Sequence, residues 1–132
     1  MNEPRLSELA RHVLDSEDVG SEAELSVILI TPDHMRRLNS RYADNDYATD
    51  VLSFPMTEDE ESELMLGDVV ICPRVAQDNA SKLGHGLPEE LDTLLVHGTL
   101  HLLGYDHQGA EDKADMERRQ REILTSFPQV PR

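Results

Sequence analysis

Residues 88–104 read PEELDTLLVHGTLHLLG, and this stretch predicts a buried helix. Its leucine and valine side chains fall on nearly every side at helical spacing, and a helix that is apolar nearly all round packs inside a protein. Gly104 is typical of the left-handed residue that ends a helix. Gly98 lies in the middle, where glycine costs about 0.5 to 1 kcal/mol relative to alanine, so a close neighbour or a steric need is expected there.

Outward from this central buried helix, hydrophobic periodicity predicts alternating helices and strands. Further helices are predicted at residues 4–16, 32–42, 73–83 and 110–127, and strands at residues 25–30, 50–55 and 67–72. The last helix is expected to turn Ala114, Met116 or Glu117, Ile123 and Leu124 toward the body of the protein. Pro55 indicates a strand end or an exposed edge. Three strands and about five helices predict a single α/β or α+β domain over residues 1–132, with helices packed on a small sheet.

The composition fits a compact domain with its own core. The chain has 132 residues, 38% hydrophobic and 30% charged, which is too apolar for disorder. No run approaches the roughly 18 apolar residues of a membrane span, and residues 1–4 begin no signal peptide, so a cytoplasmic protein without a membrane partner is expected. Cys72 lies in an apolar run and is expected to be a buried, inert thiol, which argues against thiol catalysis.

The charge balance works against unaided binding to phosphate backbones. Asp and Glu number 27 against 12 Lys and Arg, a formal net charge of −15, so any nucleic-acid role must overcome that field locally. The acidic stretch at residues 58–63 is interpreted as a solvated loop. Arginine, which clamps phosphates well, gathers in two segments: Arg36, Arg37 and Arg41, and Arg118, Arg119 and Arg121. The second group is expected to pair with neighbouring acids.

Three histidines within eleven residues predict a metal site. His97 and His101 are four apart, so they share one helix face and can both aim at one ion. Gly104 can end the helix and turn the chain so that His107 returns as a third ligand. Three histidines around one Zn²⁺ leave a fourth position open, which is typical of a catalytic site. The alternative, separate core histidines, leaves buried rings needing their own hydrogen-bond partners. Imidazole also suits Ni, Cu and Fe.

The same spacing occurs in the metzincin protease signature H-E-x-x-H-x-x-G-x-x-H. Gly98 replaces the glutamate that acts there as general base, which disfavours peptide hydrolysis by that route. A metallohydrolase acting on peptides therefore stays open, but it ranks behind the two candidate functions described below. One further hypothesis is that Gly98 opens room above the metal for a bulky group such as a phosphodiester.

Residues 97–107, HGTLHLLGYDH, resemble the H-G-x-L-H-L-x-G-Y-D-H signature of the YbeY family. Residues 49–55, TDVLSFP, and residues 67–71, GDVVI, agree with the same family, as does the spacing to Met116-Glu117 and Ile123-Leu124, so the resemblance extends from Leu38 to Leu124. It implies a zinc-dependent, single-strand-specific endoribonuclease that acts in rRNA maturation, notably at the small-subunit rRNA 3′ end, and in ribosome quality control. It also implies a histidine helix lying against a mixed sheet, and His97, His101 and His107 as metal ligands.

The sequence departs from this family pattern at one position. The family commonly carries an arginine directly after the aromatic residue that precedes the TDVLSFP block, but here Ala43 follows Tyr42. Arg41 is therefore interpreted as a phosphate contact from a neighbouring position, with a surface salt bridge as the alternative. Asp106 is expected either to orient a histidine ligand or to cap the turn. Ser53 and Asp68 are family positions without an assigned role.

Two mechanisms and one other class of function stay open. In the first mechanism the metal ion lowers the pKa of water and polarises a phosphoryl oxygen, so hydroxide attacks the phosphodiester. In the second the ion only stabilises charge, and the RNA 2′-hydroxyl attacks. The alternative class is a ribosome-associated assembly factor with a mainly structural zinc. The charge of −15 favours contact with RNA through the small ribosomal subunit or a basic ribosomal protein.

Overall fold

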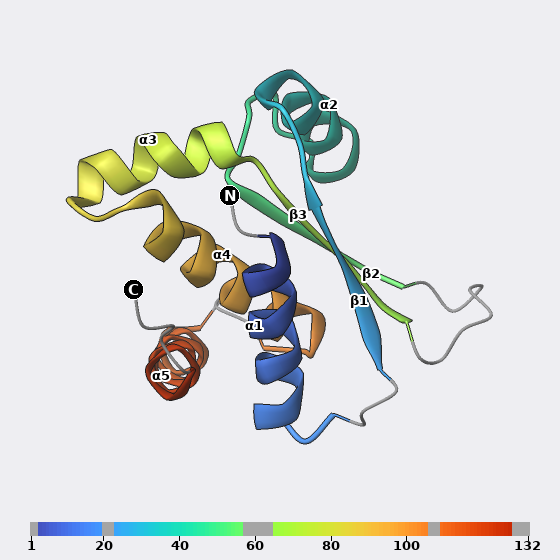
Figure 1. Cartoon of the computed structure of the whole chain (residues 1–132). Coiled ribbons are helices and arrows are strands. Elements are labelled where there is room, and N and C mark those ends of the chain that lie inside the picture. Colours follow the sequence, from blue (N-terminus) through green and yellow to red (C-terminus); the bar gives the residue numbers. More distant parts are fainter. Residues whose placement is uncertain (1–2, 20–22, 57–64, 106–108, 128–132) are drawn as a thin grey trace.

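The computed structural model describes residues 3–19, 23–56, 65–105 and 109–127. Within these ranges the chain forms five helices and three strands, each within two residues of its predicted bounds (Figure 1). In chain order they are α1 (Glu3–Ser16), β1 (Glu24–Leu29), α2 (Pro32–Ala43), β2 (Val51–Pro55), β3 (Met65–Ile71), α3 (Pro73–Leu83), α4 (Leu87–Leu102) and α5 (Ala110–Ser126). Among the described helices, none combines the length and apolar character that crossing a bilayer requires.

The three strands form one mixed sheet in the order β1-β3-β2. The central strand β3 runs parallel to β1 and antiparallel to β2, with Val69 in register with Val27 on one side and Ser53 on the other. β2 is an edge strand that ends at the exposed Pro55, as predicted, because proline cannot donate to a sheet ladder. The mixed α/β architecture implied by the family resemblance is confirmed.

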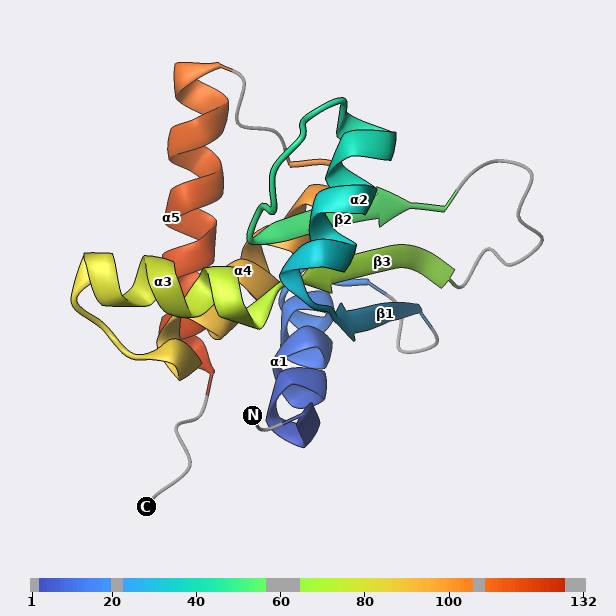
Figure 2. The ribbon, with the colours of Figure 1, turned by 90° about the horizontal axis from the view of Figure 1, so that it is seen from above.

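Alternate residues of β3 pack into two separate apolar clusters. Val69 and Ile71 belong to the larger cluster, which includes side chains of α1, α4 and α5. Val70 belongs to the smaller one with Met35 of α2 and Cys72, whose thiol is buried as predicted. Since successive strand residues point to opposite faces, α2 covers one face of the sheet while α1 and α4 cover the other (Figures 1 and 2).

Helix α4 is the central helix of the domain. Leu95, Val96 and Leu100 are fully buried, and α4 contacts α1, α3, α5 and two strands of the sheet. The buried helix predicted from residues 88–104 is therefore confirmed. In α5, Met116 and Ile123 are buried as expected, but Ala114 is exposed, so the prediction that it faces the body was wrong.

Gly98 is where α4 touches the sheet. A Cβ built on Gly98 would lie 2.7 Å from Val69 Cγ1, closer than real Cβ atoms approach, and 3.1 Å from Ser53 Oγ, which is a tight contact. The Ser53 hydroxyl donates a hydrogen bond to the Gly98 carbonyl at 2.9 Å. The close neighbour predicted for this glycine is thus the sheet itself. The hypothesis that Gly98 opens room for substrate was wrong, because the side that lacks a side chain faces β2 and β3.

We expect Gly98→Ala to lower the free energy of unfolding by about 1–2 kcal/mol, since overpacking outweighs the better helix propensity of alanine. Urea denaturation of the single variants and of Gly98→Ala with Val69→Ala measures the effect. The double variant removes the clashing methyl group, so it should be less destabilised than the sum of the two singles. Wild-type stability of Gly98→Ala would contradict the contact.

Candidate functional site

His97 and His101 lie one turn apart on the same face of α4. Their rings are almost parallel, with an angle of 8° between the planes and 6.2 Å between the centroids. His97 is half-buried and His101 is exposed. The structure thus brings together two of the three histidines that the sequence singled out. The His97 ring lies partly between α4 and its neighbours, and the His101 ring lies at the surface.

Gln120 of α5 holds the ring of His97. The distance from His97 Nδ1 to Gln120 Oε1 is 2.7 Å. An amide oxygen only accepts hydrogen bonds, so Nδ1 is the donor in this contact, and Nε2 is the ring nitrogen that could bind a metal ion. This is the arrangement that metal-binding histidines use, one nitrogen donating to a protein oxygen and the other binding the ion.

Gln120 is not among the residues that the sequence singled out. A signal for it was present, because Gln120 lies four residues after Met116 and three before Ile123, two buried side chains of α5. A polar residue on the apolar stripe of an amphipathic helix needs a buried partner, and His97 is that partner.

The chain turns directly after α4. Gly104 has φ +106, a conformation that suits glycine, so the predicted end of the helix is confirmed. Tyr105 follows, and the Glu17 carboxylate beside its hydroxyl raises the pKa of Tyr105 above its usual value. Arg119 of α5 donates to Glu17 at 3.2 Å and to the Ser16 carbonyl at 2.6 Å. The end of α1 and helix α5 together anchor the chain where it leaves the histidine helix.

The predicted ligand His107 and the neighbouring Asp106 lie outside the described residues. Both roles of Asp106 and the third ligand therefore stay predictions. Within the part of the chain that the structure describes, no three His, Cys, Asp or Glu side chains gather closely enough to hold a metal ion. His97 and His101 contribute two ligands of the predicted set, and the residues that would complete it follow Tyr105.

Arg41 lies apart from the histidines, on α2 and across the sheet from α4. It is exposed, and its guanidinium carbon is 5.5 Å from the centre of the Tyr42 ring. Arg36 on the same helix donates to Asp46 at 2.7 and 3.3 Å, and this hydrogen-bonded pair holds the pKa of Asp46 below its usual value. The predicted phosphate contact of Arg41 is not part of the histidine site.

Two further histidines, and the remaining residues named from the sequence, have ordinary surroundings. His34 is exposed on α2, and His85 lies 2.7 Å from a carboxylate oxygen of Glu90. Asp68 lies in β3, in register with Phe54. Arg118 and Arg119 pair with carboxylates as expected; their partners are Asp115, Glu17 and Glu122. The prediction was wrong for Arg121, which has no carboxylate oxygen within 4.0 Å among the described residues. The acidic stretch at residues 58–63 lies outside the described ranges.

The chain is similar to many proteins named endoribonuclease YbeY. One from Pelotomaculum thermopropionicum is 46% identical over 124 residues, which cover 90% of this chain and 82% of that protein. Another from Saccharopolyspora erythraea is 43% identical over 134 residues, covering 95% of this chain and 73% of the relative.

The fold comparison agrees with these sequence matches. The solution structure of TM1509 from Thermotoga maritima superposes with a TM-score of 0.66 at 29% identity, covering 92% of this chain and 77% of the other. The relatives' shared name favours a nuclease over the assembly factor and the peptidase that the sequence left open. The family model described as Endoribonuclease YbeY matches residues 1–128, and the chain belongs to this family.

Proposed function

We propose that this protein is a metal-dependent endoribonuclease that cleaves single-stranded RNA, with His97, His101 and His107 as the ligands of one zinc ion. The observation that carries the proposal is the pair of near-parallel imidazoles on α4, together with the hydrogen bond that places the proton of His97 on Nδ1. The endoribonuclease name of the relatives supports RNA as the substrate. The proposed role is maturation of the small-subunit rRNA 3′ end and ribosome quality control.

The two described histidines fit a zinc-like ion. Each can supply an imidazole nitrogen, a donor that zinc accepts, and the i,i+4 spacing orients both rings to the same side of α4. When bound, such an ion supplies a positive charge that polarises a phosphoryl oxygen and lowers the pKa of water. The exposed ring of His101 lies on the side that RNA can reach, while the half-buried His97 is fixed by Gln120.

The helix offers no general base at the position where metzincin proteases have one. Any side chain at position 98 would collide with Val69 and Ser53, so a glutamate cannot occupy it in this packing. Ser53 does not replace such a base, since its hydroxyl donates to the Gly98 carbonyl. Neither position 98 nor Ser53 therefore supplies the base that takes the proton from the nucleophile.

The net charge of −15 bears on how the protein meets its substrate. Long-range repulsion slows the approach of an acidic protein to free RNA. A basic surface on a bound partner raises the rate at which the protein encounters RNA. We therefore assign the small ribosomal subunit, or one of its basic proteins, as the cytoplasmic partner that brings this enzyme to rRNA.

We expect His101→Ala to lose both bound metal and RNA cleavage while the fold is retained, because His101 is exposed and its ring is not part of the core. Protein purified without a histidine tag should contain about one zinc per chain by mass spectrometry. His34→Ala, on an exposed helix face across the sheet, is the matched control and should keep both properties. Full activity in a metal-free His101→Ala protein would refute the metal mechanism.

Replacement of Gln120 should change zinc affinity without removing a ligand. Gln120→Leu leaves His97 Nδ1 without its acceptor, and we expect zinc affinity to fall about 10- to 100-fold. Gln120→Glu restores an acceptor and should bind zinc at least as tightly as the wild type. Competition with a chromophoric chelator gives the affinities, ¹⁵N shifts of the metal-free proteins report the His97 tautomer, and Arg121→Leu serves as control. Equal affinity in wild type and Gln120→Leu would show that this hydrogen bond does not position the ligand.

The ends of the cleaved RNA identify the nucleophile. We expect products with 5′-phosphate ends, as attack by hydroxide on the phosphodiester gives. Labelled single-stranded RNA, digested and then analysed by chromatography against synthetic standards, provides the measurement. A cyclic 2′,3′-phosphate would instead show that the RNA 2′-hydroxyl attacks, and would remove the hydroxide route.

A further inference from the structure

Two of the three arginines of α2 differ from most other arginines that the structure describes. Nine arginines lie in the described ranges, and six have a carboxylate oxygen within 4.0 Å: Arg5, Arg11, Arg36, Arg74, Arg118 and Arg119. Among these described residues Arg37, Arg41 and Arg121 have no carboxylate so close, although acids outnumber bases by 27 to 12. Two of the three are neighbours on one helix face.

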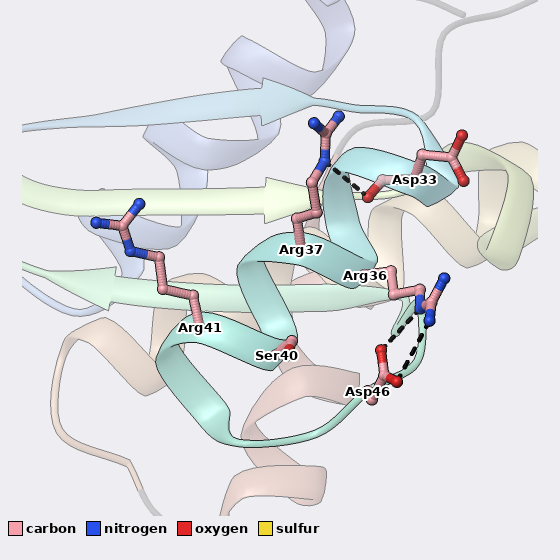
Figure 3. Close-up of a pocket in the computed structure, with 6 residues that line it drawn as sticks. All are labelled: Asp33, Arg36, Arg37, Ser40, Arg41 and Asp46. Atoms are coloured by element: carbon pink, nitrogen blue, oxygen red, sulfur yellow. Dashed lines mark hydrogen bonds and ion pairs between the residues drawn. The ribbon is translucent and has the colours of Figure 1, made fainter.

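Arg37 and Arg41 border the same hollow on the solvent side of α2. It has a volume of about 530 Å³ and is lined by Asp33, Arg36, Arg37, Ser40, Arg41 and Asp46. Figure 3 shows the guanidinium groups of Arg37 and Arg41 on the same side of the helix, away from the Arg36–Asp46 pair. Arg37 makes only a long hydrogen bond, 3.4 Å, to the Asp33 carbonyl. Two guanidinium groups one turn apart can contact successive phosphates of one strand.

An aromatic ring stands beside these arginines. The Tyr42 side chain is 61% exposed, yet its ring is held edge-on against Phe54 at 5.4 Å. A fixed, exposed ring next to arginine is how proteins stack the bases of single-stranded nucleic acids without reading sequence. An acidic protein segment would use the two charges but leave the ring unexplained, so the observations favour RNA.

We propose that Arg37, Arg41 and Tyr42 form a binding surface for single-stranded RNA, separate from the histidine site and on the opposite face of the sheet. The proposal rests on the endoribonuclease function proposed above. It extends the phosphate contact of Arg41 to a surface that holds RNA outside the cleaved segment. The surface binds the strand through phosphates and one stacked base, and it contributes affinity rather than chemistry.

The test compares Arg37→Gln/Arg41→Gln with a control of equal charge, Arg74→Gln/Arg118→Gln, whose arginines are exposed and already paired with acids. Anisotropy at low temperature measures affinity for an RNA of about 20 nucleotides across a salt series, and a gel confirms intact RNA. We expect the α2 variant to bind about tenfold more weakly. Its slope of log K against log salt should fall by about 0.7 for each phosphate that the protein no longer neutralises. Tyr42→Leu should weaken binding by a similar factor with an unchanged slope.

Cleavage of a short RNA of about four nucleotides separates this surface from the metal site. The α2 variant should cut the short RNA at the wild-type rate, whereas His101→Ala should cut neither RNA. Affinity and slope equal to those of the control variant would overturn the surface and assign the two arginines to another partner, such as an acidic protein segment. Equal loss on short and long RNA would also overturn it. Neither result tests the proposed metal ligands. Wild-type cleavage by His101→Ala would instead contradict the histidine site.

Discussion

The backbone of α4 lies directly on the sheet at Gly98, and the orientation of the histidine helix follows from that contact. With Val69 Cγ1 only 2.7 Å from where a Cβ would be, the helix can approach β2 and β3 this closely at residue 98 because that residue has no side chain. The hydrogen bond from Ser53 to the Gly98 carbonyl fixes the rotation of the helix about its axis. His97 and His101 flank Gly98 along the chain, so this rotation determines the direction in which both rings point.

Much of this arrangement could be predicted from the sequence because it depends on local pattern. The apolar positions of residues 88–104 repeat at helical spacing, and Gly104 ends the helix with a positive φ, so the amino-acid pattern alone indicates both the helix and its end. The position of His97 and His101 on one face follows from four-residue spacing on any helix. The burial of Cys72 follows in the same way from the apolar run in which it stands.

The parts that could not be predicted depend on which elements pack together. Gln120 reaches His97 from a helix 23 residues further along the chain, and no local pattern gives the pairing of α4 with α5. The direction in which Gly98 faces was misjudged for the same reason, since the sequence shows a glycine but not the strand beneath it. Ala114 was predicted on the buried side of α5, but it lies about 200° around the helix from Met116, and since Met116 is buried, Ala114 is exposed.

The contact at Gly98 also links the fold to the chemistry. A metzincin glutamate at this position would need its Cβ inside the space held by Val69 and Ser53, so the packing that orients the histidines excludes the base that proteases with this spacing use. To admit a glutamate, α4 would have to lift from the sheet and break the Ser53 hydrogen bond, and His97 would then lose its position opposite Gln120. The histidine spacing is therefore shared with proteases, but the packing that holds the histidines in place leaves no room for the glutamate that those proteases use as a base.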